Sequence, residues 1–85
     1  MTAVRVYGKP GCSNCTLECN LLRARGVEVE YIDVTADEAA MQTIVDLGYL
    51  GVPVTIDGDD HWQGIDRDRL NECIEKRSAL GVSKG

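Results

Sequence analysis

The segment Tyr7-Gly8-Lys9-Pro10-Gly11-Cys12-Ser13-Asn14-Cys15 carries the strongest structural signal in the chain, because a cysteine pair follows a loop of glycine and proline. The preceding residues 3–7 alternate in polarity and predict a short strand. Residues 8–11 predict a loop. A helix is predicted from Cys12 to about Arg25, just before a glycine that favours its end. The cysteine pair therefore lies where a loop after the first strand becomes a helix.

Periodicity and turn residues predict three more strands and two more helices along the chain. They are, in order, a strand over 27–33, a helix from Thr35 to Gly48, strands over 52–56 and 61–63 joined by a hairpin turn, and a helix capped by Asp66. The order β-α-β-α-β-β-α begins with a parallel βαβ unit and ends in an antiparallel hairpin. It predicts an α/β fold in which three helices cover a four-stranded mixed sheet.

The apolar positions of each helix indicate the face that packs against this sheet. The expected core positions are Leu17, Leu21 and Ala24 in the first helix, Ala40, Met41, Ile44, Val45 and Leu47 in the second, and Leu70, Cys73 and Ile74 in the third. Thr35 with Glu38 three residues later has the pattern of a capping box, so Thr35 is expected to cap the second helix.

Length and charge limit the classes of function. A chain of 85 residues is expected to form a single domain over 1–85, with 81–85 as a frayed tail. The net charge of −5 disfavours binding to nucleic acid or to an anionic membrane. No apolar run has membrane-spanning length, and the first residues lack the pattern of a secretory signal. We expect a monomer in the cytoplasm.

The position of Cys12 and Cys15 favours redox chemistry. A thiol at a helix N-terminus faces unpaired backbone N–H groups and the positive end of the helix dipole, and both stabilise a thiolate. Lys9 adds positive charge, and Gly11 leaves the Cys12 sulfur open to a partner. Cys15 lies one turn further in and is expected to be buried and protonated. Cys12 would then attack a disulfide, and Cys15 would resolve the mixed disulfide.

The other two cysteines leave alternatives open. Cys12, Cys15, Cys19 and Cys73 could in principle form a zinc site, although structural zinc usually uses two closely spaced pairs. Cys19 is poorly spaced for a bridge to Cys15 and is interpreted as structural filler or a surface thiol. Cys73 lies among apolar residues and is predicted to be a buried core residue.

Three segments together resemble the glutaredoxin-like branch of the thioredoxin superfamily, and most closely the NrdH-redoxins: residues 7–15, Gly51-Val52-Pro53 and Trp62-Gln63-Gly64. The resemblance covers about residues 3–77 in order and spacing. It implies a thioredoxin/glutaredoxin-like fold and a dithiol–disulfide oxidoreductase with no bound cofactor. Electrons would come from NADPH through a separate thioredoxin reductase. They would pass to class Ib ribonucleotide reductase or another disulfide-containing protein.

The resemblance also implies roles for single residues. By position, Cys12 is the attacking thiol and Cys15 the resolving one. Val52-Pro53 matches the family's cis-proline site, where the backbone pairs with the substrate chain. The implied substrate-binding set is Lys9, Gly11, Val52, Pro53, Trp62 and Gly64. The chain departs from the family pattern at Ser13-Asn14, at Gln63 and at 65–67. These departures bear on how a reductase would dock.

A glutathione-dependent glutaredoxin is the alternative function. Gln63 stands where true glutaredoxins have a glycine, and its side chain would crowd a bound glutathione. Asp66 could still contact the glutathione amine. Trp62 is interpreted either as a core aromatic or as a partly exposed member of an apolar patch around the reactive sulfur. His61 is expected to be a solvated turn residue.

Overall fold

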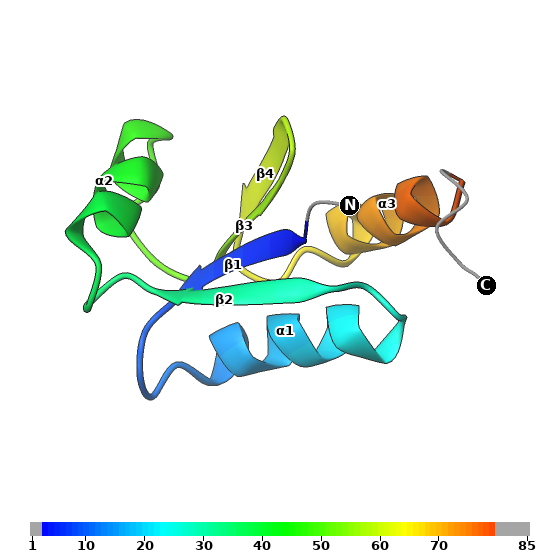
Figure 1. Cartoon of the computed structure of the whole chain (residues 1–85), viewed down its shortest axis with the longest axis horizontal. Coiled ribbons are helices and arrows are strands. Elements are labelled where there is room, and N and C mark those ends of the chain that lie inside the picture. Colours follow the sequence, from blue (N-terminus) through cyan, green and yellow to red (C-terminus); the bar gives the residue numbers. More distant parts are fainter. Residues whose placement is uncertain (1–2, 80–85) are drawn as a thin grey trace.

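The strands and helices follow one another in the predicted order (Figure 1). The computed structural model describes residues 3–79, so the tail predicted at 81–85 lies outside the described residues. The elements are β1 (Val4–Gly8), α1 (Ser13–Ala24), β2 (Val29–Asp33), α2 (Glu38–Asp46), β3 (Val54–Asp57), β4 (Asp60–Gln63) and α3 (Arg67–Ala79). In the described part of the chain, no helix has the length and apolar character needed to cross a membrane.

The strands form one mixed sheet in the order β2-β1-β3-β4. β1 is parallel to β2 and antiparallel to β3, and β3 is antiparallel to β4. One face packs against α1 and α3 through a core that includes Val4, Val6, Leu22 and Leu70. The opposite face packs against α2 through a smaller cluster that includes Tyr7, Ile44 and Val54. The predicted α/β architecture is confirmed.

The predicted inner face of α1 is wrong. Leu17 and Ala24 are exposed and Leu21 is only half-buried. The buried side chains of this helix are instead Cys15, Glu18, Cys19 and Leu22. The sequence pattern missed this face because a glutamate stands in the middle of it, and a glutamate is almost never fully buried unless its carboxyl group has partners.

Glu18 has such partners. Its Oε2 atom accepts a hydrogen bond of 2.6 Å from the Thr55 hydroxyl and one of 2.9 Å from Trp62 Nε1. Oε1 is buried without a hydrogen-bond partner among the described residues. The carboxyl group thus joins α1 to β3 and β4, and it sets which side of the helix faces the sheet.

The start of α2 also differs from the prediction. Asp37 caps this helix, because its Oδ1 accepts a 3.1 Å hydrogen bond from the amide of Ala40. Thr35 bonds instead to Asp33, through both its amide and its hydroxyl group. Only two of the five predicted core positions of α2 are buried, Ala40 and Ile44, while Met41, Val45 and Leu47 are exposed. A nine-residue helix touches the sheet along a narrow stripe, so its flanking apolar positions remain in solvent.

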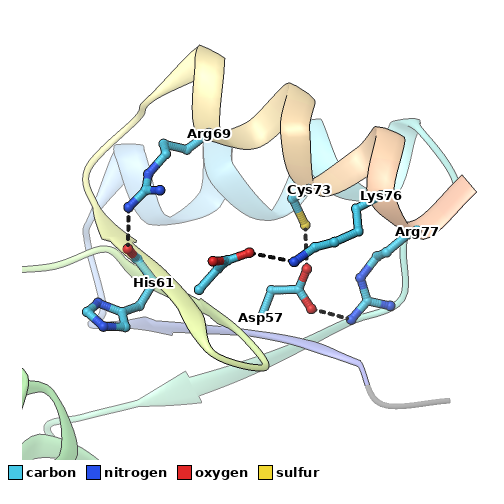
Figure 2. A network of polar contacts seen from close by, with 7 residues as sticks. Asp57, His61, Arg69, Cys73, Lys76 and Arg77 are labelled. Atoms are coloured by element: carbon cyan, nitrogen blue, oxygen red, sulfur yellow. Dashed lines mark hydrogen bonds and ion pairs between the residues drawn. The ribbon is translucent and has the colours of Figure 1, made fainter. Parts of the chain in front are cut away.

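Side chains of α3 bind the β3–β4 hairpin in a polar network (Figure 2). The Cys73 thiol donates to Asp57 Oδ2 at 3.0 Å, and Arg77 donates to Asp57 Oδ1 at 2.8 Å. The Arg77–Asp57 ion pair is mostly buried, whereas Lys76 pairs with Asp60 at 2.6 Å in a half-exposed position. The predicted inner face of α3 is confirmed, since Leu70, Cys73 and Ile74 are buried as expected.

The buried carboxyl group of Glu18 predicts a dependence of stability on pH. Burial raises its pKa above the ordinary value of 4.5, and the hydrogen bonds from Thr55 and Trp62 oppose this only in part. A carboxyl group with a raised pKa in the folded state stabilises the fold at low pH, and that contribution is lost as pH rises through the folded-state pKa. As pH rises above the ordinary pKa of 4.5, the free energy of unfolding of Glu18→Gln, measured in urea, should therefore increase relative to that of the unmodified chain. Parallel pH profiles of the two proteins would contradict this.

Asp57 should show the opposite dependence. Burial alone would raise its pKa, but hydrogen bonds from Cys73 and Arg77 and the Arg77 charge outweigh it and hold the pKa below the ordinary value of 3.8. This stabilisation is present above the unfolded-state pKa and is lost as pH falls through the folded-state pKa. Asp57→Asn should lower the free energy of unfolding by about 2 kcal/mol at neutral pH, and by less in acid. Asp60→Asn is the control on the half-exposed pair and should cost less than about 1 kcal/mol. Equal costs would show that Asp57 has no special role.

Candidate active site

Cys12 and Cys15 form a disulfide at the start of α1, with their Cα atoms 5.3 Å apart. Cys12 is the N-cap residue and is half-buried, whereas Cys15 lies within the first turn and is only 1% exposed. Cys12 Sγ accepts a 3.1 Å hydrogen bond from the amide of Cys15. The expected asymmetry between an accessible sulfur and a covered one is therefore present.

The surroundings of Cys12 favour a thiolate when the disulfide is reduced. The amide of Cys15 and the positive end of the α1 dipole both point at its sulfur. Lys9 is exposed in the preceding turn, and its carbonyl accepts the amide of Cys12 at 3.3 Å. Gly11 is exposed with a φ of +78°, a conformation that favours glycine, and no atom lies within 4 Å of where its Cβ would be. The residue before Cys12 thus adds no side chain that could cover the sulfur.

Gly8 is a site residue that the sequence analysis missed, because it was assigned to the loop. It ends β1, and a Cβ added there would lie 2.9 Å from both Cβ and Sγ of Cys15. Cβ atoms do not approach other heavy atoms so closely, so a larger residue would displace Cys15. The absence of a side chain at Gly8 lets the buried cysteine pack directly on the central strand.

The segment predicted as the cis-proline site lies beside this end of β1. The Val52-Pro53 peptide bond is cis. Tyr7 pairs with Val54 in the antiparallel register, which places Pro53 next to Gly8 on the neighbouring strand. Pro53 is buried, and its carbonyl accepts a 2.8 Å hydrogen bond from the amide of Gly64. The structure therefore brings the cysteine pair, the proline loop and the end of the hairpin together.

Trp62 does not belong to an exposed patch around the sulfur. It is only 5% exposed, and its indole N–H points into the core toward Glu18. The interpretation as a core aromatic is confirmed, and the one that exposed it is wrong. Gly64, at the end of the same hairpin, is half-buried with a φ of +77°. The buried Glu18 carboxyl group on α1 explains the position of Trp62, and no local sequence pattern indicates this acceptor.

His61 is not a solvated turn residue. Its Nδ1 atom lies 2.7 Å from the Tyr49 hydroxyl, and the two rings meet edge to face with centroids 5.6 Å apart. Its backbone carbonyl accepts a 3.2 Å hydrogen bond from Arg69 (Figure 2). The half-buried imidazole thus connects the hairpin to the loop after α2.

Two residues near the hairpin end bear on the choice of reductant. Gln63 is exposed, and its Nε2 atom would lie 3.1 Å from a Cβ added to Gly51, so its side chain reaches across to the proline loop. Asp66 Oδ1 accepts a 3.1 Å hydrogen bond from the amide of Arg69. Its carboxylate therefore already caps α3, as predicted.

Cys19 and Cys73 are free and buried. Burial raises the pKa of the Cys19 thiol. Burial, and the Asp57 carboxylate that accepts its proton in a hydrogen bond, raises the pKa of Cys73 to about 12. Both groups remain thiols at neutral pH, in keeping with core positions. Among residues 3–79, no group of three or more His, Cys, Asp or Glu side chains is arranged to hold a metal ion.

Leu50 is the most exposed large apolar residue of the described chain, at 97%. It stands two residues before Val52, on the loop that ends in the cis proline. No sequence pattern marks it, because a lone leucine close to glycine residues has no periodicity. An exposed aliphatic side chain on this loop is available to a docked partner.

Comparison with known proteins agrees with this geometry. The glutaredoxin family model matches residues 4–62. The Gene 56 protein of Mycobacterium phage L5 is 34% identical over 79 residues, which cover 89% of this chain and 76% of that protein. The glutaredoxin-like protein NrdH of Salmonella typhimurium is 28% identical over 69 residues, covering 81% of this chain and 85% of that protein.

A solved structure agrees as well. It is that of the glutaredoxin-like protein NrdH-redoxin from Escherichia coli, described as having a thioredoxin-like activity profile. It superposes with a TM-score of 0.78 at 27% identity and covers 84% of this chain and 93% of the other. The chain belongs to the glutaredoxin family of thiol–disulfide oxidoreductases, within which it resembles the NrdH-redoxins.

Proposed function

We propose that this protein takes electrons from a thioredoxin reductase and passes them to protein disulfides, with class Ib ribonucleotide reductase as the principal acceptor. The observation that carries the proposal is the half-exposed Cys12 sulfur at the N-terminus of α1, bonded to a buried Cys15. We place the reaction in the cytoplasm, with the protein acting as a monomer. No bound cofactor is needed, because NADPH is oxidised by the separate reductase.

The proposed cycle uses the two sulfurs in sequence. The Cys12 thiolate attacks one sulfur of the substrate disulfide, forms a mixed disulfide and releases the other substrate sulfur as a thiolate that takes up a proton. Cys15 then loses its proton and attacks the Cys12 sulfur. This closes the Cys12–Cys15 disulfide and releases the second substrate thiol. The protein is oxidised by two electrons, and the reductase returns them.

Three features of the site support a protein reductant over glutathione. Gln63 lies against Gly51, so it narrows the surface along which a glutathione backbone would lie. The net charge of −5 repels an anionic tripeptide, and the single positive charge of Lys9 does little against it. Leu50 provides an exposed apolar contact on the proline loop for a protein partner, which the buried Trp62 does not.

The alternative glutathione-dependent activity depends on Asp66. The resemblance to glutaredoxins implies that an acidic group at this position contacts the glutathione amine. Here the Asp66 carboxylate is engaged in capping α3. A glutathione amine would therefore compete with an existing hydrogen bond, which weakens the alternative.

The order of the two sulfurs can be tested by trapping. Cys12→Ser should abolish disulfide reduction, because the accessible nucleophile is lost. Cys15→Ser should accumulate a mixed disulfide with substrate, because nothing resolves it. Non-reducing electrophoresis and mass spectrometry would detect the adduct. Cys19→Ser is the control and should retain most of the turnover, since the Cys19 thiol is buried and protonated. Equal trapping by the Cys12→Ser and Cys15→Ser proteins would refute the assignment.

The electron source can be tested by a coupled assay of NADPH oxidation. Turnover with thioredoxin reductase should exceed turnover with glutathione and glutathione reductase by about tenfold or more, roughly 1.4 kcal/mol in transition-state free energy. Gln63→Gly should raise the glutathione rate by opening the groove beside Gly51. Gln63→Leu, which keeps the bulk of the side chain, is the matched control and should leave that rate low. Faster turnover of the unmodified chain with glutathione would favour the glutaredoxin alternative.

A further inference from the structure

Tyr31 contacts the active site from the edge of the sheet, and the proposed cycle does not use it. It lies on β2 in register with Val6 on β1. Its side chain therefore lies on the same face of the sheet as Val6 and Gly8, the face that α1 covers. Figure 1 shows α1 running along β2. In the strand order β2 is the edge strand, so no other strand of the described sheet lies beyond Tyr31.

The Tyr31 ring and the Cys15 sulfur occupy the same small space above Gly8. A Cβ added to Gly8 would lie 2.8 Å from Cε1 of Tyr31 and 2.9 Å from Sγ of Cys15. Both groups thus approach the bare backbone of Gly8 more closely than any side chain there would allow. A sulfur beside the edge of an aromatic ring is also a favourable contact.

The two side chains differ in exposure. Cys15 is 1% exposed, whereas Tyr31 is 42% exposed. The tyrosine is therefore partly in solvent, while its ring reaches the point above Gly8 where the Cys15 sulfur is buried. Burial, followed by the nearby Asp33 carboxylate, raises the pKa of the phenol, so the ring is uncharged at neutral pH.

We propose that Tyr31 is a positioning residue that covers the Cys15 sulfur and restricts it to reaction with Cys12. The proposal depends on the role of Cys15 as the resolving thiol. With Cys15 covered, an external disulfide or thiol reaches only Cys12. The resolving sulfur reacts only with the mixed disulfide formed one turn away. Without the ring, Cys15 would compete with Cys12 for external disulfides, and the order in which the two sulfurs react would be lost.

The test measures access to Cys15 directly, in a Cys12→Ser background that leaves Cys15 unpaired. Iodoacetamide would be added to the reduced protein, and fragment mass spectrometry would follow the alkylation of each cysteine. Tyr31→Ala should speed alkylation of Cys15 by about tenfold, since accessibility limits the reaction of a buried thiol. Tyr31→Phe should leave the rate within about twofold, because the ring remains. Met41→Ala, a residue of similar exposure on α2, is the matched control.

Cys73 serves as the internal reference for loss of structure. It lies on α3 and is buried against the β3–β4 hairpin, whereas Tyr31 lies on β2 at the other edge of the sheet, so Cys73 should be alkylated at an unchanged rate in every variant. If Tyr31→Ala unfolds the chain and Cys73 reacts as well, Tyr31→Val keeps a strand-forming residue and should still speed alkylation of Cys15 while Cys73 stays at its unchanged rate. An unchanged Cys15 rate in folded Tyr31→Ala or Tyr31→Val would overturn the proposal. This outcome would leave the proposed function intact, because trapping by Cys15→Ser tests that function separately.

Discussion

The helix that carries both active-site cysteines is oriented by one buried carboxyl group. Glu18 accepts hydrogen bonds from Thr55 and Trp62, and through them α1 is tied to both strands of the hairpin. A buried carboxyl group without hydrogen-bond partners destabilises the folded state. Rotation of α1 about its axis would break these bonds, so the orientation of the helix is fixed. With Glu18 facing the sheet, Cys15 three residues earlier must face it too. Cys12, outside the first turn, remains at the surface.

The same orientation accounts for the chemical difference between the two sulfurs. Cys15 packs onto Gly8, where the lack of a Cβ provides the space. Cys12 Sγ accepts the amide of Cys15 at the start of the helix, and the residue before it, Gly11, has no side chain. The Cys12 sulfur is thus stabilised as a thiolate and open to partners, whereas the Cys15 sulfur is buried. A dithiol reductant needs this division of roles, because two equally exposed thiols would both capture substrate.

Much of the fold followed from local patterns in the sequence. Alternation in residues 3–7 and 27–33 and the hairpin turn predicted the strands, and the apolar positions Leu70 and Ile74 predicted the inner face of α3. Three of the errors share one cause. The inner face of α1, the exposed interpretation of Trp62 and the solvated His61 all depended on polar partners distant in sequence. Glu18 and Trp62 are 44 residues apart, and no window of local periodicity includes both.

The sequence by itself determined the chemistry, because a Cys-x-x-Cys pair between a Gly-Pro loop and a helical pattern places thiols at a helix N-terminus wherever that helix packs. It also determined the order of strands and helices. The tertiary structure alone decided which face of α1 is buried, why Gly8 must lack a side chain, and that Tyr31 lies beside Cys15. These depend on the approach of separate elements, whose atoms meet only when the sheet has formed. A residue that usually lies at the surface can then be held in the core by hydrogen-bond partners, as Glu18 is.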